Sequence, residues 1–352
     1  MAIASGKIFM ERLPDLQTEV LPYNGLNLHM NKADFWSSKL RLQNNNWLFK
    51  KWWKSWQAQG LEGDGLLLDI GANYGVASWE FLSQGFVSST IMFEPIQENC
   101  ECIMRSYEGK ENIYQIFNNA VSEQNGEISF QYNPKQTGTS HIVGTGGNRT
   151  VKTVSIDSFD FPQVKLMKVD VEGHELDVLK GAQGRIKQDQ PWVFFECNHA
   201  NPQEIQKVCK VINWFLEQDY VPLSSSHHHI LDETSIIASS LASNSILAGV
   251  NDLFAVPRSS LPTDVDSINL YKVYQQQLSK SGKVAFWKDQ VPWFHLSNVE
   301  QQKLAKIPNE GEILQPSRTN KVYTQMEGSV VYTEKFFQVF YQYQNPLSDI
   351  FS

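Results

Sequence analysis

Short apolar runs alternate with amphipathic stretches through the middle of the chain. Residues 66–70 are three leucines followed by Asp69 and Ile70, and this run predicts a strand that is buried on both faces. Similar runs predict strands at 90–93, 113–117, 126–132, 151–156, 164–171 and 191–196. Helical spacing of apolar residues predicts helices at 98–111, 176–187 and 201–218. Strands that alternate with helices predict an α/β fold with a mostly parallel sheet and helices on both faces.

The turn after the first of these strands contains Gly71, Asn73 and Gly75. Glycine suits a tight turn in which the backbone approaches a ligand, and ligands of such folds bind at the carboxyl ends of the strands. A dinucleotide fingerprint would also require glycine at positions 73 and 76, where this chain has Asn73 and Val76. Glu94 ends the next strand, where a carboxylate can accept hydrogen bonds from both ribose hydroxyls. The loop and the acid together favour S-adenosylmethionine as the ligand.

Four segments carry a resemblance to a known family. They are DIGANYG at 69–75, FEP at 93–95, NNAVS at 118–122 and KVDVEGHELDVLKGA at 168–182. In order and spacing this set resembles the FkbM family of methyltransferases over residues 66–257. The resemblance implies a class I methyltransferase (Rossmann-like) fold, S-adenosylmethionine as cofactor and, usually, O-methylation of a small molecule or sugar. It does not identify the methyl acceptor.

Three regions of different character follow from these patterns. We expect an N-terminal, aromatic-rich helical extension at 1–65, a methyltransferase domain at 66–258 and a C-terminal extension or subdomain at 259–352. The first region holds five of the ten tryptophans, and residues 46–59 predict a helix within it. This helix either packs over the active site as a lid or only covers the sheet. Aromatic residues at helical spacing more often form core, which favours the second interpretation.

The chain beyond residue 218 is less regular. Residues 220–223 and 252–256 are similar to the closing antiparallel strands of a class I methyltransferase, and the insertion at 224–244 carries three consecutive histidines at 227–229. Consecutive histidines lack the spacing of metal ligands on a helix, so a polar surface loop is expected. Farther on, we predict a helix at 268–280 and either an amphipathic helix or a strand at 329–343. This region either shapes the substrate pocket or forms an oligomer interface. A homo-oligomer is therefore one of the alternatives.

Composition limits the compartment and the partners. A formal charge of −8 over 352 residues argues against general nucleic-acid binding, which depends on basic surfaces. No apolar run reaches the roughly 18 residues of a membrane span, and the charges within residues 1–16 do not suit a secretory signal. The four cysteines lack zinc-type spacing and indicate buried, reduced thiols. We therefore expect a cytoplasmic protein with no membrane span and no nucleic-acid partner.

The expected site lies where the strands end. The residues expected to bind the cofactor are Asp69, Gly71, Asn73, Gly75, Glu94, Asn119, Ala120 and Asp170. Asp170 is expected to contact the ammonium group of the cofactor's methionine part. A hydroxyl acceptor also requires a base, and His174 and Glu172 are the candidate catalytic residues. His174 is equally well explained as a capping or supporting residue.

The acceptor is expected to contact His141, Glu196 and Asn198. His141 lies in the segment 134–147, which is rich in glycine, serine and threonine and forms either a solvated loop or a mobile loop over the substrate. Asp170, Glu196 and Asn198 also offer oxygen atoms like those of magnesium-dependent catechol-type O-methyltransferases. Magnesium is an alternative that we do not favour, so the metal ligands stay unknown at this point.

Several functions compete on this evidence. The favoured one is an S-adenosylmethionine-dependent O-methyltransferase that acts on a small-molecule, sugar or peptide-like natural product. A carboxyl methyltransferase that forms a methyl ester on a peptide or acid is the main rival. A catalytically inactive cofactor-binding module that serves a partner protein is an alternative of another class. A nicotinamide oxidoreductase is disfavoured by Asn73.

Overall fold

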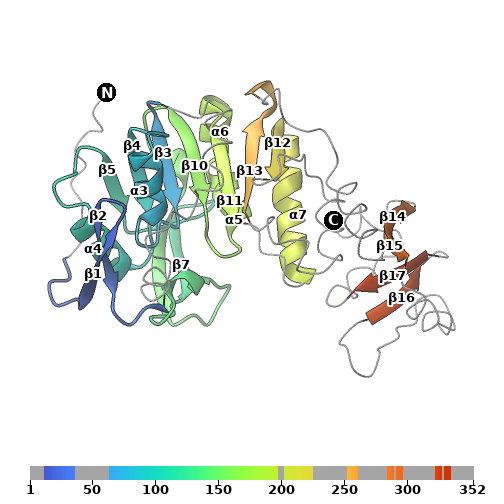
Figure 1. Ribbon diagram of the computed structural model, residues 1–352, viewed down its shortest axis with the longest axis horizontal. Coiled ribbons are helices and arrows are strands. Elements are labelled where there is room, and N and C mark those ends of the chain that lie inside the picture. The colour runs from blue at the N-terminus through green and yellow to red at the C-terminus, as the bar shows by residue number, and fades with distance from the viewer. Residues whose placement is uncertain are drawn as a thin grey trace. The chain divides into compact units, whose positions relative to one another are not determined.

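The computed structural model describes residues 12–35, 63–196, 202–224 and 252–260, together with four short strands between residues 284 and 333. The chain divides into two compact units, residues 1–196 and residues 197–352 (Figure 1). This division does not coincide with the expected domain boundaries at 65/66 and 258/259, which stay predictions. No helix among the described residues combines the length and the apolar character that a membrane crossing requires.

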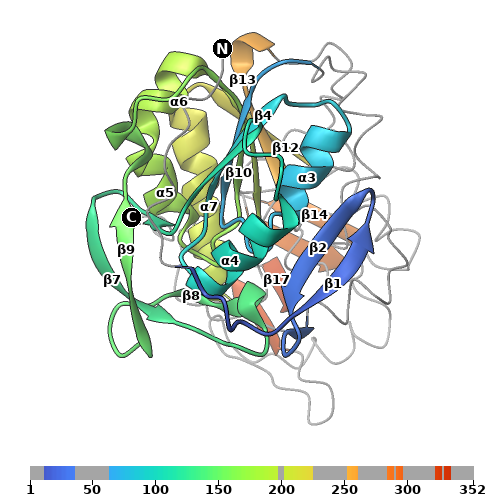
Figure 2. The same ribbon diagram turned by 90° about the vertical axis from the view of Figure 1, so that its left-hand side faces the viewer.

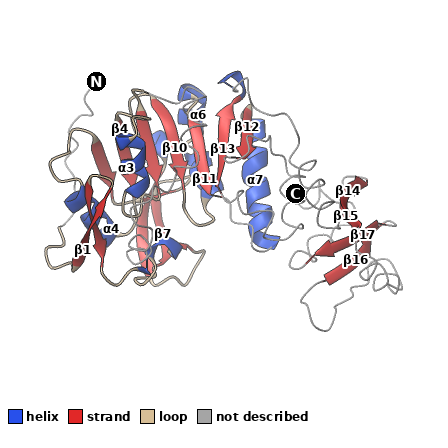
Figure 3. Ribbon diagram, in the orientation of Figure 1, coloured by secondary structure: helices blue, strands red, loops and turns tan. Residues whose placement is uncertain are grey.

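The first unit is built on five parallel strands in the order β11-β10-β3-β4-β5 (Figure 3). These strands are β3 Leu66–Ile70, β4 Ser89–Phe93, β5 Tyr114–Phe117, β10 Val164–Val169 and β11 Trp192–Glu196. All residues of β3 are buried, as expected of a central parallel strand that is covered on both faces. The register pairs Ile70 with Phe93 on one side and with Val169 on the other. The residues that follow these three strands therefore meet at one edge of the sheet.

Helices cover the two faces of this sheet (Figure 2). Helices α3 Val76–Ser83 and α4 Gln97–Ser106 share a hydrophobic core on one face, and α5 Glu175–Gly181 and α6 Gln183–Asp189 lie on the other. This layering confirms the predicted Rossmann-like α/β fold. The helix predicted at 176–187 is divided in two, because the carboxylate of Asp157 accepts hydrogen bonds from the N–H groups of Gly184 and Arg185 at 2.7 and 2.8 Å. The same carboxylate therefore caps the start of α6.

The described part of the N-terminal region is a β-hairpin rather than a helix. Strands β1 Thr18–Tyr23 and β2 Leu26–Asn31 pair antiparallel through a turn at Asn24 and Gly25, whose φ angles are 49° and 86°. Two positive φ angles define the turn that suits a two-residue hairpin, and Asn-Gly is its preferred sequence. The description of residues 1–65 as a helical extension is therefore wrong for this stretch. The helix predicted at 46–59, with its two interpretations, lies outside the described residues.

A smaller four-stranded sheet occupies the chain between β5 and β10. Its order is β6-β9-β7-β8, with the bounds β6 Ala120–Val121, β7 Gly126–Gln131, β8 His141–Ile142 and β9 Arg149–Val154. Two 3-10 turns complete this segment, η1 Thr137–Thr139 and η2 Ile156–Ser158. The strands predicted at 126–132 and 151–156 are thereby confirmed to within two residues. The segment predicted as a loop at 134–147 contains both a 3-10 turn and a short strand.

The second unit begins with α7 Pro202–Glu217 and the antiparallel strands β12 Tyr220–Ser224 and β13 Asp252–Pro257, followed by η3 Arg258–Ser260. The predicted helix at 201–218 and the predicted antiparallel pair are confirmed. Two further hairpins are β14 Val284–Lys288 with β15 Val291–His295, and β16 Val322–Met326 with β17 Ser329–Thr333. The strand alternative for the start of 329–343 is thus the correct one. The histidines at 227–229 and the helix predicted at 268–280 lie outside the described residues.

Cysteine placement agrees with the sequence analysis where the structure describes it. Cys100, Cys102 and Cys209 are buried free thiols. Burial raises the pKa of the Cys102 thiol to about 12, so this group is protonated and unreactive at neutral pH. Cys197 lies outside the described residues.

Candidate cofactor and substrate site

The turn after β3 depends on glycine at position 71. Gly71 has a φ of 77°, and an added Cβ would lie 1.9 Å from the carbonyl oxygen of Asp170. Its N–H donates a hydrogen bond of 2.9 Å to the carbonyl oxygen of Phe93, which ties the turn to the end of β4. Gly75 precedes α3 and has a φ of 72°, and an added Cβ would lie 3.2 Å from the ring of Tyr107. Close packing, against the end of β10 at Gly71 and against Tyr107 at Gly75, therefore explains both glycines before any ligand is considered.

Glu94 follows β4 and is 3% exposed. Its carboxylate accepts hydrogen bonds from the N–H groups of Asn73 at 2.7 Å and Ile96 at 2.9 Å. Burial raises the pKa of Glu94 to about 8, although these two N–H donors and the charge of Lys168 lower it. Oε1 also accepts a hydrogen bond of 3.5 Å from the side-chain amide of Asn99, whereas Oε2, which accepts from the N–H of Asn73, has a second lone pair and keeps acceptor capacity toward a ligand.

A buried lysine lies beneath the site. The ammonium group of Lys168 on β10 lies 3.1 Å from Asp69 Oδ1 and 3.3 Å from Asp170 Oδ2, and it donates a hydrogen bond of 3.0 Å to the carbonyl oxygen of Gly71. Burial lowers the pKa of Lys168, but the charges of Asp69 and Asp170 outweigh it and raise that pKa above its ordinary value. The lysine therefore stays charged and holds three strand-end groups together. The sequence analysis assigned it no role.

A pocket of about 790 Å³, part of it open to solvent, lies at this edge of the sheet. Eight of the residues predicted for the site line it: Gly71, Asn73, Glu94, Asn119, Ala120, Asp170, Glu172 and Glu196. Asp69 and Gly75 do not. The carboxylate of Asp69 is fully buried and accepts a hydrogen bond of 2.7 Å from the Ser78 hydroxyl, so its partners are inside the fold.

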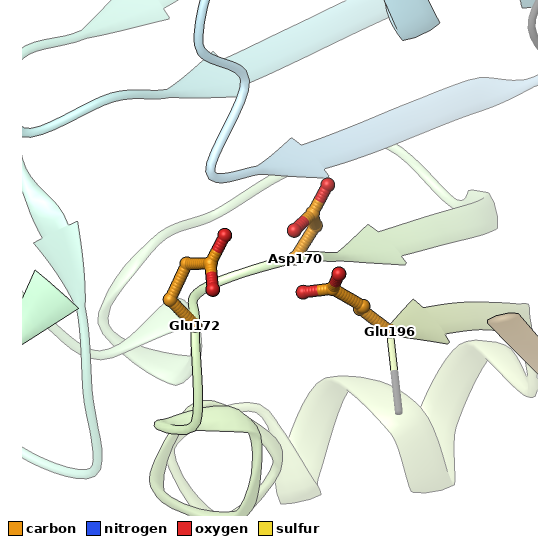
Figure 4. A group of neighbouring side chains, drawn as sticks. All are labelled: Asp170, Glu172 and Glu196. Carbon is orange, nitrogen blue, oxygen red and sulfur yellow. The ribbon is translucent and has the colours of Figure 1, made fainter. Parts of the chain in front are cut away.

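Three acidic side chains converge on one side of the pocket (Figure 4). Asp170, Glu172 and Glu196 each place a carboxylate oxygen within 4.8 Å of those of the other two, and all three residues are half-buried. Glu172 has a φ of 54°, an uncommon conformation that Gly173 continues at 94°. Among the described residues that line the pocket there is no lysine, arginine or histidine. This side of the pocket therefore presents a negative surface to a ligand.

Such oxygen atoms are of the type that divalent cations prefer, but half-buried acidic groups also occur without a metal. Asn198, the amide expected to complete a metal site, lies outside the described residues. The identity of any metal ligands stays unknown.

The structure does not bring the two candidate histidines to the pocket. His174 precedes α5, where Nε2 lies 2.9 Å from the Ser122 hydroxyl and Nδ1 lies 3.2 Å from Asp177 Oδ2. This is the supporting position that the sequence left as an alternative. His141 lies between the pocket residues Ser140 and Ile142 but is not part of the lining, and its Nδ1 lies 2.9 Å from the carbonyl oxygen of Thr139.

Sequence reasoning missed part of the lining. Thr137, Gly138 and Ser140 line the pocket from the segment 134–147, and Phe130 and Ile142 supply apolar surface beside them. The alternative that places this segment over the site was the better one. Its only signal in the sequence was its position between the third and fourth strands of the parallel sheet.

With this geometry established, comparison with known proteins is informative. Residues 69–233 match the model of the methyltransferase FkbM domain. The chain is similar to this domain over 165 of its 352 residues. It is 29% identical over 152 residues to the hexuronic acid methyltransferase AglP of Haloferax volcanii, a match that covers 42% of this chain and 62% of that protein. The chain thus spans less than two thirds of this relative.

Solved structures are more distant. The methyltransferase FkbM of Methylobacillus flagellatus KT shares 18% identity, with 38% of this chain and 33% of that chain covered and a TM-score of 0.31. TrmK of M. capricolum in complex with S-adenosyl-homocysteine shares 7% identity, with 65% and 82% covered and a TM-score of 0.32.

Proposed function

We propose that the protein is an S-adenosylmethionine-dependent methyltransferase that methylates a hydroxyl group of a small-molecule, sugar or peptide-like acceptor. This proposal rests on one observation. The glycine turn, the buried carboxylate of Glu94 and the carboxylate of Asp170 all line the same pocket. The match of residues 69–233 to the FkbM domain supports it.

The residues present fit this cofactor. Glu94 offers carboxylate oxygens for ribose hydroxyls, and Asp170 offers an anion for an ammonium group. Asn119 and Ala120, which follow β5, line the side of the pocket where the adenine of such a cofactor is expected. The cofactor, when bound, supplies an electrophilic methyl group on a sulfonium. The protein's task is then to orient the acceptor oxygen in line with that group and to accept its proton.

The negative side of the pocket favours a hydroxyl over a carboxylate acceptor. A carboxylate about 4 Å from one of these acids would be repelled by roughly 4 kcal/mol at an effective dielectric constant near 20. A hydroxyl instead donates a hydrogen bond to such a group. Glu172 lines the pocket and is placed to accept the hydroxyl proton, whereas the ring of His174 is engaged by Ser122 and Asp177. Glu172 is therefore the proposed base, and carboxyl methylation is the less favoured alternative.

Ligand binding tests the cofactor. We expect S-adenosylhomocysteine to bind the full chain with micromolar or stronger affinity in titration calorimetry, and NAD to give no measurable heat, because Asn73 and Val76 replace two glycines of the dinucleotide fingerprint. Binding of NAD without S-adenosylhomocysteine would refute the proposal. Binding without methyl transfer to any acceptor in a broad screen would instead favour the inactive module.

The affinity for S-adenosylhomocysteine is expected to rise with pH. Glu94 has a pKa of about 8 in the free protein, and the ribose hydroxyls bind its ionised form. The affinity should therefore increase roughly five- to tenfold from pH 7 to pH 8.5, as the ionised fraction grows through this pKa. Glu94→Gln is the matched control, because an amide of the same shape does not titrate and should give a weaker, flat profile. A wild-type profile as flat as that of Glu94→Gln would show that Glu94 is already ionised or does not contact the ligand.

A further inference from the structure

One wall of the pocket is tied to a part of the chain that precedes the FkbM domain. Asp34 follows the N-terminal hairpin, lies outside the matched residues 69–233 and is 1% exposed. Its Oδ2 accepts hydrogen bonds from the Tyr74 hydroxyl at 2.7 Å and from the N–H of Thr137 at 3.2 Å, and it also accepts one from the Thr137 hydroxyl. One buried carboxylate oxygen thus joins the glycine turn to the segment that contains η1.

The hairpin is a fixed base for this connection. Its buried residues Leu26, Leu28 and Met30 belong to the same hydrophobic core as α4. The indole N–H of Trp79 on α3 donates to the carbonyl oxygen of Asn24 at 3.1 Å. The guanidinium of Arg105 on α4 donates to carbonyl oxygens in the stretch that leads into β1. Asp34 therefore extends from a segment that is packed and hydrogen-bonded to two helices.

The connection reaches the pocket through Thr137. Thr137, Gly138 and Ser140 line the pocket, and the Thr137 hydroxyl oxygen also lies 3.2 Å from Asn73 Oδ1 in the glycine turn. A second link runs beside it, because the N–H of Phe35 donates a hydrogen bond of 2.8 Å to the carbonyl oxygen of Lys135. The segment 135–140 is thus attached at both its start and its middle to the residues that follow the hairpin.

We propose that Asp34 is a positioning residue that holds the wall formed by residues 137–140 against the glycine turn and so slows release of the ligand from the pocket. The N-terminal region is then part of the site rather than an independent extension. A hydrogen bond to a buried carboxylate is stronger than one between neutral groups, so this carboxylate is well suited to hold a short segment in place. Only the ligand-release part of this inference rests on the proposed function.

Hydrogen exchange in the full chain, without ligand, tests the attachment. Thr137→Val keeps the shape of the side chain and removes its hydroxyl bond to Asp34, and Asp34→Ala removes the acceptor. In both variants we expect amides of residues 135–142 to exchange about 10- to 100-fold faster, the equivalent of one hydrogen bond to a charged group at 1.4 kcal/mol per factor of ten. Amides of β3 and β10 should be unchanged.

Thr139→Val is the matched control. Thr139 lies in the same 3-10 turn and is exposed. Its hydroxyl donates to the carbonyl oxygen of Gln136 at 2.9 Å and accepts a hydrogen bond of 3.1 Å from the side-chain amide of Asn133, and neither bond involves Asp34. It should exchange like the wild type. Unchanged exchange at 135–142 in Thr137→Val, or equally faster exchange throughout the first unit, would overturn the proposal. If Asp34→Ala does not fold, hydrogen exchange in Thr137→Val alone tests the attachment.

The effect of Asp34 on ligand release is tested separately, by the dissociation rate of the ligand. Asp34 does not line the pocket, so Asp34→Ala should raise the dissociation rate of S-adenosylhomocysteine about tenfold or more while Thr139→Val leaves it unchanged. Faster exchange with an unchanged dissociation rate would confirm the attachment and reject its effect on the ligand. If the wild type binds no S-adenosylhomocysteine, the proposed function fails, and the exchange experiment still decides whether Asp34 holds the wall.

Discussion

Glu172→Gln is expected to lower kcat for methyl transfer to a hydroxyl acceptor by about 10²–10⁴-fold, with the affinity for S-adenosylhomocysteine nearly unchanged. The glutamine keeps the size of the side chain but cannot accept a proton at the carboxylate position. Glu172 lines the pocket, and a carboxylate oxygen of this residue lies within 4.8 Å of carboxylate oxygens of Asp170 and Glu196. Single-turnover methyl transfer and calorimetry on the same variant separate the two quantities.

His174→Gln is the comparison for this prediction. Both ring nitrogens of His174 face Ser122 and Asp177, so its replacement should affect the melting temperature more than kcat. If His174→Gln lost activity selectively and Glu172→Gln did not, the assignment of the base would be wrong. Treatment of the wild type with EDTA is a second control. Complete loss of turnover on chelation would make the acidic group a cation site and would transfer the activation of the acceptor to the metal.

Lys168→Met is expected to lower the free energy of unfolding by about 3–5 kcal/mol. Removal of one partner from a buried ion pair leaves the other charge without compensation, and here two carboxylates lose the same ammonium group. Asp69 is fully buried, and the carbonyl oxygen of Gly71 loses its 3.0 Å hydrogen bond as well. Urea denaturation that monitors the unfolding of the first unit measures this change in the free energy of unfolding.

Lys152→Met provides the matched control for Lys168→Met. Lys152 also lies on a strand, β9, but it is exposed, and its replacement should change the free energy of unfolding by no more than about 0.5 kcal/mol. A loss below about 1 kcal/mol in Lys168→Met would show that Asp69 and Asp170 find other partners or bind protons. In that case Lys168 would not be what holds the ends of β3 and β10 together.

Much of the α/β framework could be predicted from the chain because its signals are local. A strand that is buried on both faces is apolar along its length, as in β3, and a turn at positive φ requires glycine, as at Gly71. Parallel strands then bring their carboxyl ends to one edge, which is why Glu94, Asp170 and Glu196 could be expected together. The hairpin at Asn24-Gly25 also has a local signal, because Asn-Gly is the preferred sequence of a two-residue hairpin turn.

The sequence by itself therefore determined the order of the strands and helices, the edge of the sheet that carries the site and the acidic character of that site. Only the tertiary structure decided which side chains face the pocket. The sequence motifs place Asp69, Asp170 and His174 near strand ends. Packing then decides that Asp69 pairs with Lys168 and that His174 contacts Ser122. Of the three, only Asp170 lines the pocket. A contact between segments that are far apart in the chain produces no periodic residue pattern in a single sequence. Asp34 lies 103 positions before Thr137, and only folding brings the two together.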